Sequence, residues 1–170
     1  MFRLSKLVFF FALCFAQLVG GSAVHGQTAS KVNPPPSIAV SISIDRDSVT
    51  QGQTPWAILT VKNLTERELP IHDWAVRVHI EGQNGEPPAT LIQRLMTGKL
   101  QPGDQAIRAD EQWLWEIPPG ESSSHKYKLS YFYDLNAPGK YVVYLEVLDP
   151  VSQKSLRTNT AKFEIQASKQ

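Results

Sequence analysis

The 170-residue sequence contains a single cysteine, Cys14, which falls within an apolar run near the N-terminus. A disulfide joins two cysteines, so no bridge within the chain can stabilise the fold. Leu13 precedes Cys14 at the position where a lipidated cysteine requires a small residue, and a lipid anchor is therefore not predicted. The stability of the fold must come from its hydrophobic core.

The sequence also has no large excess of either charge, because its 17 lysines and arginines are nearly balanced by 16 aspartates and glutamates. Residues 1–26 hold two of the basic residues and none of the acidic ones, which leaves a formal charge of −1 on the remainder. A near-neutral chain without a basic run is not attracted electrostatically to nucleic acids or to anionic membrane surfaces. We therefore predict no nucleic-acid partner.

The sequence has no recognisable catalytic constellation. It contains no Gly-x-Ser-x-Gly elbow and no glycine-rich phosphate loop. Ser122–Ser124 precede His125, but neighbouring residues of one strand point to opposite faces and do not form a nucleophile–base pair. His79 and Glu81 share a strand face, yet a closed zinc site takes about four ligands. We predict no enzymatic activity, no cofactor and no metal site.

The first 26 residues have the three parts of a secretory signal peptide. Arg3 and Lys6 form the basic region, residues 7–19 form the apolar run, and small residues follow. The apolar run is shorter than the roughly 20 residues that span a bilayer. Cleavage is predicted after Gly26, or alternatively after Ala23. We expect export to the periplasm or the exterior, with no stable membrane span after cleavage.

Residues 27–37 are polar and proline-rich, which predicts an extended linker. From residue 38 to residue 167, apolar and polar residues alternate in short runs that are bounded by turn residues, as in half-buried β-strands. No helical periodicity is convincing there. The predicted strands cover residues 38–44, 56–64, 74–81, 113–115, 122–133, 141–147 and 161–165. Seven or eight short antiparallel strands at this spacing predict an all-β sandwich.

Three motifs refine this prediction: Ala57–Asn63 on the second strand, Ile117–Glu121 before the fifth, and Ala137–Tyr141 before the sixth. Their order resembles that of bacterial exported immunoglobulin-like and fibronectin-type-III-like domains, such as the CARDB-like domains. The resemblance implies an immunoglobulin-like β-sandwich of seven to eight antiparallel strands. It does not specify a function, because such sandwiches host adhesion, scaffolding, inhibition and sugar binding.

The same resemblance implies a structural corner formed by Pro138, Gly139 and Tyr141. In sandwiches of this class the corner tyrosine donates its hydroxyl to a backbone carbonyl a few residues upstream, which pins the crossing between the sheets. Tyr141 matches that role. Trp74 is expected to be the buried tryptophan of the third strand.

Two surfaces are candidates for binding. If the third, sixth and last strands are neighbours, their outer face presents an apolar pair amid mixed charge, which is typical of a protein-binding patch. The candidate partner surface consists of Arg77, His79, Val142 and Tyr144. Trp113 and Trp115 lie two residues apart on one strand face and are the candidate pair for stacking on sugar rings. A solvated sheet face, and tryptophans that cap the core, are the alternatives.

The sequence therefore favours an exported, non-enzymatic β-sandwich that binds another protein or a cell-envelope component. The first alternative is a carbohydrate-binding module that uses Trp113 and Trp115. The second is a protease inhibitor whose loops carry no readable motif. Exposure of the two indole rings distinguishes the carbohydrate hypothesis from the others.

Overall fold

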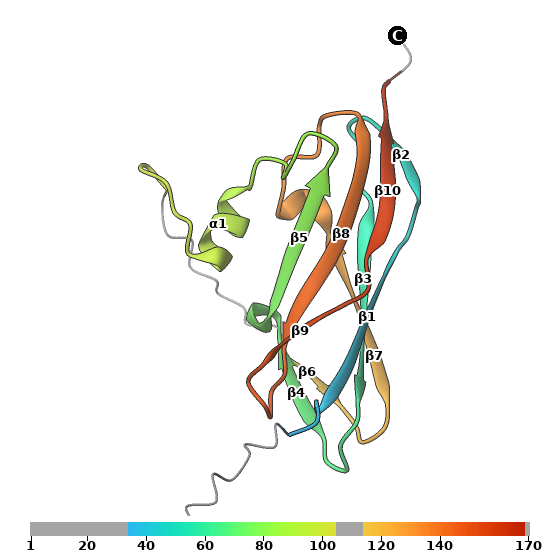
Figure 1. Ribbon diagram of the computed structural model, residues 1–170, viewed down its shortest axis with the longest axis vertical. Coiled ribbons are helices and arrows are strands. Elements are labelled where there is room, and N and C mark those ends of the chain that lie inside the picture. Colours follow the sequence, from blue (N-terminus) through green and yellow to red (C-terminus); the bar gives the residue numbers. More distant parts are fainter. Residues whose placement is uncertain (1–33, 105–113, 169–170) are drawn as a thin grey trace, which may run out of the picture. The chain divides into compact units, whose positions relative to one another are not determined.

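The computed structural model describes residues 34–104 and 114–168, and in these residues it contains ten strands, one α-helix and two 3-10 turns (Figure 1). One sheet has the strand order β1–β3–β7, and both of its strand pairs are antiparallel. Its strands are β1 (Ile38–Ile44), β3 (Trp56–Asn63) and β7 (Ser122–Lys128).

The second sheet has the order β2–β10–β8–β5, with β9 also paired to β8. Its strands are β2 (Ser48–Thr50), β5 (Val76–Gly82), β8 (Gly139–Leu148), β9 (Ser155–Arg157) and β10 (Ala161–Gln166). A short third sheet pairs β4 (Leu69–His72) with β6 (Leu114–Ile117). All described pairs are antiparallel except β2 with β10, which is parallel.

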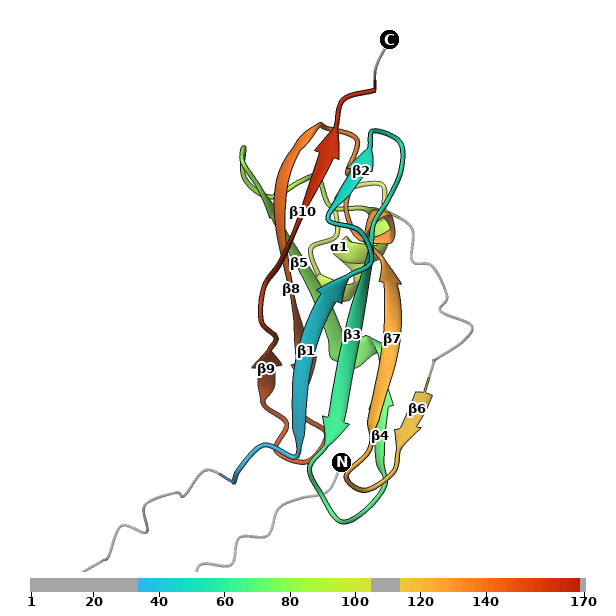
Figure 2. The same cartoon turned by 90° about the vertical axis from the view of Figure 1, so that its right-hand side faces the viewer.

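The two larger sheets face each other and enclose the core (Figure 2). Alternate residues supply that core, because successive side chains of a strand point to opposite faces. Ala57, Leu59 and Val61 on β3 are fully buried, as the sequence predicts. Val143 and Leu145 on β8 face them from the second sheet and are equally buried. The all-β sandwich predicted from the alternation is confirmed.

The chain crosses from β7 to β8 through the 3-10 turn η2 (Leu129–Tyr131) and residues 132–138. The hydroxyl of Tyr141, at the start of β8, donates a 2.6 Å hydrogen bond to the carbonyl of Ala137. The Tyr141 ring stacks on Phe163 of β10, with the ring centroids 5.2 Å apart. The end of the crossing is thus tied both to the backbone and to the neighbouring strand.

Three expectations are wrong in detail. Trp74 is 57% exposed, because the chain at η1 (Asp73–Ala75) makes a 3-10 turn before β5 begins. The strand predicted over residues 122–133 is shorter, because β7 ends at Lys128, and Tyr131 beyond its end is 54% exposed. Residues 91–97, which gave no helical signal, form α1 (Leu91–Thr97).

Helix α1 begins and ends at residues suited to those positions. The hydroxyl of Thr90 accepts a hydrogen bond from the N–H of Gln93, and Gly98 closes the helix in the left-handed conformation. Its seven residues are too few to show a 3.6-residue period, and it is too short to cross a membrane. No helix in the described ranges meets that requirement of length and hydropathy.

Candidate functional site

The candidate partner surface lies on the outer face of the second sheet, where β8 runs between β5 and β10. The pairing register aligns outward residues in rows across the strands. Arg77 of β5 lies opposite Glu146 of β8, and His79 lies opposite Tyr144. Val142 lies between Glu81 of β5 and Lys162 of β10. The structure therefore brings all four predicted surface residues onto one face.

Tyr144 is held in place by its neighbours. The His79 ring stacks on it, with centroids 4.7 Å apart and an angle of 6° between the planes. The guanidinium carbon of Arg157 lies 3.6 Å from the centre of the Tyr144 ring. His79 comes from β5 and Arg157 from β9, which flank β8 on opposite sides, so the tyrosine ring lies between them. Such cation–π and stacking contacts hold the ring in one orientation.

His79 has a second contact on the same face. Its Nε2 atom is buried and lies 3.6 Å from Oε2 of Glu146, which is too long for a hydrogen bond. The carboxylate of Glu146 also accepts a 3.4 Å contact from the Ser155 hydroxyl of β9. The outer face therefore carries charged side chains of both signs around the fixed Tyr144 ring.

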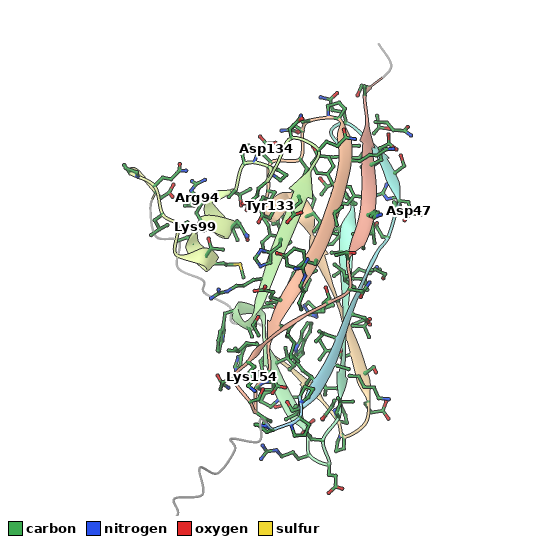
Figure 3. The ribbon with its side chains drawn as sticks, in the orientation of Figure 1. Asp47, Arg94, Lys99, Tyr133, Asp134 and Lys154 are labelled. Atoms are coloured by element: carbon green, nitrogen blue, oxygen red, sulfur yellow. The ribbon has the colours of Figure 1, made fainter. Side chains whose placement is uncertain are left out.

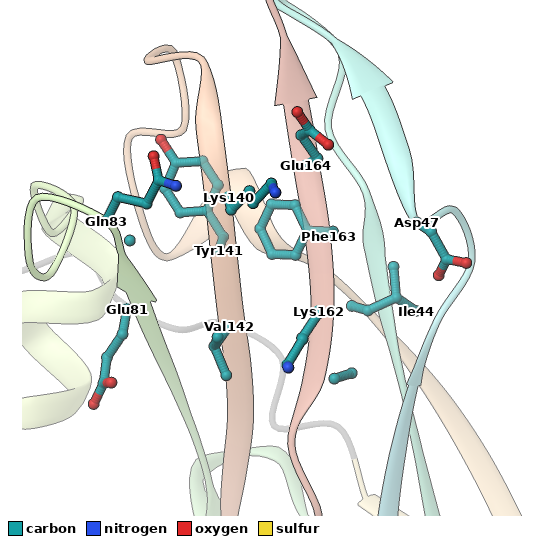
Figure 4. A pocket seen from close by; sticks show the side chains of 12 residues that line it. Ile44, Asp47, Glu81, Gln83, Lys140, Tyr141, Val142, Lys162, Phe163 and Glu164 are labelled. Carbon is teal, nitrogen blue, oxygen red and sulfur yellow. The ribbon is translucent and has the colours of Figure 1, made fainter.

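A groove of about 810 Å³ opens on this face beside Val142 (Figure 4). We call it the Val142 groove. Apolar side chains from three elements line it, namely Ile44, Tyr141, Val142, Ala161 and Phe163. Charged side chains of both signs surround them, namely Asp47, Glu81, Lys140, Lys162 and Glu164. An apolar centre with a polar rim is the usual anatomy of a protein-binding surface.

A smaller pocket, of about 390 Å³, lies between β5 and helix α1. Arg94, Lys99 and Tyr133, which line it, are labelled in Figure 3. It shares Glu81 and Gly82 with the Val142 groove and is also lined by His79, Tyr144 and Arg94. The two hollows thus adjoin at the C-terminal end of β5. Arg77 lines neither hollow, so the structure separates it from the other three predicted surface residues in this respect.

Arg94 anchors the loop that follows α1. Its Nε and one terminal nitrogen donate hydrogen bonds of 2.8 and 2.6 Å to the two carboxylate oxygens of Asp104. Hydrogen bonding to Arg94, followed by the bond from the N–H of Gln101, lowers the pKa of Asp104 to about 2. The other terminal nitrogen of Arg94 donates to the carbonyl of Ala89. Arg94 is therefore engaged within the chain, although it borders the pocket.

The predicted sugar-stacking pair is not favoured by the structure. Trp113 lies outside the described residues. Trp115 packs against the core, and its ring meets the edge of His125 with centroids 4.0 Å apart and an angle of 79°. The Nε1 atom of Trp115 is buried. A half-buried ring held in this way does not offer a flat exposed platform of the kind that stacks on a sugar.

The serine-rich start of β7 is engaged in packing. The Ser124 hydroxyl lies 2.9 Å from the hydroxyl of Thr60 on the outer side of the first sheet. His125 points the other way and contacts the rings of Trp115 and Tyr127. Across residues 34–104 and 114–168, no three His, Cys, Asp or Glu side chains are grouped as metal ligands.

Two residues that shape the outer face are not among the four residues of the candidate partner surface. Arg157 belongs to β9, a three-residue strand in a segment that reads as a hairpin turn. Glu146 lies on the predicted strand, but its proximity to His79 depends on the β5–β8 register. The outward position of Glu146 was readable from the alternation, whereas nothing in the sequence indicated that Arg157 would cover Tyr144.

No protein-family model matches the sequence, and no curated protein is significantly similar to it. Solved structures with a similar fold include the CARDB domain of the PF1109 protein from Pyrococcus furiosus, in complex with di-metal ions. It is 20% identical, with a TM-score of 0.42 over 78% of this chain and 89% of that chain. This similarity concerns the fold alone.

Two enzymes also contain a similar domain. The alkylpurine DNA glycosylase AlkC of Pseudomonas fluorescens, bound to DNA containing an abasic site analog, is 13% identical, with a TM-score of 0.43. A β-glucosidase of Listeria innocua, in complex with gluconolactone, is 11% identical, with a TM-score of 0.42. This chain covers 78% and 77% of its own length in the two matches, but only 31% and 16% of those proteins.

Proposed function

We propose that the chain is an exported, non-enzymatic β-sandwich that binds another protein or a cell-envelope component through the outer face of β5, β8 and β10. The Val142 groove is the observation that supports this proposal. Its apolar lining would be covered by a partner, and its rim offers both charges for orientation. The Tyr144 ring beside it is already fixed between His79 and Arg157, so little side-chain entropy would be lost on binding.

The domain boundaries are part of the same proposal. Residues 1–26 would direct export, and residues 27–37 would link the processed N-terminus to the sandwich of residues 38–167. Ser37, the last residue of that linker, is buried, so the tether would be anchored at the first strand. Mass spectrometry of the exported protein tests the processing step. A mature chain that begins at Gln27, or at Val24, is the expected result, and an intact N-terminus contradicts it.

Binding is tested by exposing the purified domain to an envelope extract and comparing variants. Val142→Glu places a carboxylate in the apolar centre of the groove, and Tyr144→Ala removes the fixed ring. We expect both variants to lose the proteins that the unmodified domain retains. Ser41→Glu is the matched control, because it adds the same charge to an exposed strand position of the opposite sheet. Recovery of the same proteins by all four samples would exclude this face.

A further inference from the structure

The edge strands of the two larger sheets differ in whether side chains hydrogen-bond to their outward backbone groups. On β1, the side-chain amide of Asn159 accepts a 2.9 Å hydrogen bond from the N–H of Ile42 and donates a 3.0 Å bond to its carbonyl. On β5, the carbonyl of Val78 accepts hydrogen bonds from Gln93 Nε2 at 2.8 Å and from the Tyr133 hydroxyl at 3.2 Å. Side chains thus occupy outer backbone groups of Ile42 and of Val78, which discourages further strand pairing at these two positions.

Strand β7 is also an edge strand, since β3 is its pairing partner on one side. Backbone hydrogen bonds join Asn63 N–H to Glu121 carbonyl at 2.9 Å, and Leu129 N–H to Pro55 carbonyl at 3.3 Å, at the two ends of this pairing. In an antiparallel ladder every second residue exchanges these bonds, so the odd-numbered residues of β7 face β3. The N–H and carbonyl groups of Lys126 and Lys128 therefore point to the outer edge.

Within residues 34–104 and 114–168, nothing hydrogen-bonds to the N–H or the carbonyl of Lys126 or to the N–H of Lys128, whereas the carbonyl of Lys128 begins the 3-10 turn η2. We call these three groups the open edge. In this respect Lys126 differs from Ile42 of β1 and Val78 of β5, whose outer groups are bonded to Asn159 and to Gln93 and Tyr133.

A mainly apolar groove of about 410 Å³ runs beside the open edge, and we call it the β7 groove. It lies between the edge strand and elements α1, η1 and η2. Its apolar lining includes Ile92, Met96, Tyr127, Tyr131 and Phe132. Ile92 is 41% exposed and Tyr131 is 54% exposed, so apolar surface is accessible at this groove. One carboxylate lines it, that of Asp73, which accepts a 3.2 Å hydrogen bond from the Tyr127 hydroxyl.

The charged side chains on the strands of the sheet that carries the open edge have one sign. Strands β1, β3 and β7 contain no aspartate or glutamate, and they carry three lysines, Lys62, Lys126 and Lys128. All three lie on the outer side of the sheet, because the residues between them point into the core. Pairing of two β7 edges would bring the lysines of two copies together, which is unfavourable. The charge selects an acidic partner instead.

We propose that the open edge accepts an extended segment of a partner protein as an added strand, with apolar and acidic residues in alternation. The backbone of that segment would bond to Lys126 and Lys128. Its apolar side chains would enter the β7 groove, and its acidic side chains would lie on the other face, beside the lysine ammonium groups and away from Asp73. Strand addition of this kind takes affinity from main-chain bonds and specificity from alternate side chains. This surface is separate from the Val142 groove.

The test uses a set of synthetic capped pentapeptides with glutamate at positions 1, 3 and 5 and Val, Ile, Leu or Phe at positions 2 and 4. Hydrogen exchange of the unmodified domain is followed by NMR. We expect the amide protons of Lys126 and Lys128 to exchange rapidly in the domain alone and to become at least about tenfold slower with a bound peptide. Peptides with lysine in place of glutamate should bind at least about tenfold more weakly.

Two modifications separate main-chain pairing from other kinds of contact. A peptide that is N-methylated at the residues facing β7 loses its donors, and its affinity should fall about tenfold or more. Lys126→Pro removes one N–H of the open edge without removing a ladder bond, whereas Lys126→Gln removes the charge and keeps the N–H. The proline variant should lose peptide binding, and the glutamine variant should weaken it only a few-fold. The N-methylated peptide remains decisive if the proline variant does not fold.

Four results would overturn the proposal. The first is no binding by any member of the peptide set, and the second is equal binding by the N-methylated peptide. The third is slow exchange of the Lys126 and Lys128 amides in the domain alone, since the edge would then already be covered. The fourth is amide protection that rises with protein concentration in the absence of peptide, which would identify a second copy as the occupant. None of these results bears on variants of Val142 or Tyr144.

Discussion

The carboxylate of Asp149 accepts two hydrogen bonds of 2.6 Å from Ser37, one from its N–H and one from its hydroxyl, across a separation of 112 residues. It also accepts bonds of 2.9 Å from the N–H groups of Val151 and Ser152. Asp149 is fully buried, so the start of the folded domain is tied to the end of β8 by one satisfied charge. Four donors around one carboxylate make it a stabilising feature.

Asp149→Asn should destabilise the domain by roughly 3 kcal/mol at pH 7, because the amide nitrogen would face donors that then lack an acceptor. Burial alone would raise the pKa of Asp149, but hydrogen bonds from Ser37, Ser152 and Val151 outweigh it and lower that pKa below its ordinary value. The stabilisation is therefore complete above the unfolded-state pKa of about 4 and is lost as the pH falls through the folded-state pKa. Urea denaturation at several pH values measures both effects. A difference between the two proteins that stays constant below pH 4 would contradict this account.

Tyr141→Phe should lower the free energy of unfolding by about 1 kcal/mol, and by up to roughly 3 if the carbonyl of Ala137 is left without a partner. Burial, followed by the charge of Asp134, raises the pKa of Tyr141, so its hydroxyl stays protonated and donates at neutral pH. Tyr131→Phe is the matched control, since that side chain is 54% exposed. Chemical denaturation should separate the two variants, and equal stabilities would show that the Tyr141 hydroxyl does not pin the crossing.

Gly82→Ala should destabilise the domain by about 1 to 3 kcal/mol through overpacking. A Cβ atom at Gly82 would lie 3.0 Å from Cε1 of Tyr141 and 3.3 Å from the carbonyl oxygen of Gly85. The Tyr141 ring has little room to move, because it stacks on Phe163 and its hydroxyl is bonded. In a Tyr141→Leu background the same change should cost less, and thermal denaturation of the four proteins measures that coupling. Additive effects would mean that the ring does not oppose the added methyl group.

The parts of the fold that were predictable are those where side-chain alternation is strict and the strand is long. Strand β3 is the best case, with every inward residue buried as expected. The alternation through Trp74 was misleading, because a turn at Asp73 changes the side-chain direction just before β5. Strands β2, β4 and β9 have three or four residues, and so short a stretch gives no measurable period.

The candidate site was predictable as a set of outward residues, but its shape was not. Alternation places Val142 and Tyr144 on one face, and strand neighbourhood adds His79. The depth of the Val142 groove depends on Ile44 and Asp47, at the end of β1 and in the connection that follows it. The orientation of Tyr144 depends on Arg157. These contacts follow from three-dimensional register between distant segments, which a single sequence does not encode locally.

Gln93→Glu should destabilise the domain strongly at neutral pH and less at acidic pH, which is the opposite dependence from Asp149. Gln93 is 3% exposed, and its Nε2 atom donates to the Val78 carbonyl and to the Tyr133 hydroxyl, each at 2.8 Å. A glutamate there would place a buried carboxylate against a carbonyl oxygen, at a cost of roughly 3 kcal/mol. Burial would raise the pKa of the new carboxyl, so the folded state would bind a proton more tightly than the unfolded state.

Lowering the pH through that raised pKa should therefore restore part of the stability, because a protonated glutamate can donate to Val78. Gln93→Met is the control. It removes the two donated bonds and also removes Oε1, which is buried without a hydrogen-bond partner among the described residues. Because these two effects oppose each other, its stability should change by less than about 1.5 kcal/mol and show no new pH dependence. Urea denaturation between pH 4 and pH 8 compares the three proteins. Equal destabilisation by both substitutions at every pH would show that the cost comes from losing the amide donors of Gln93 and not from burying a carboxylate.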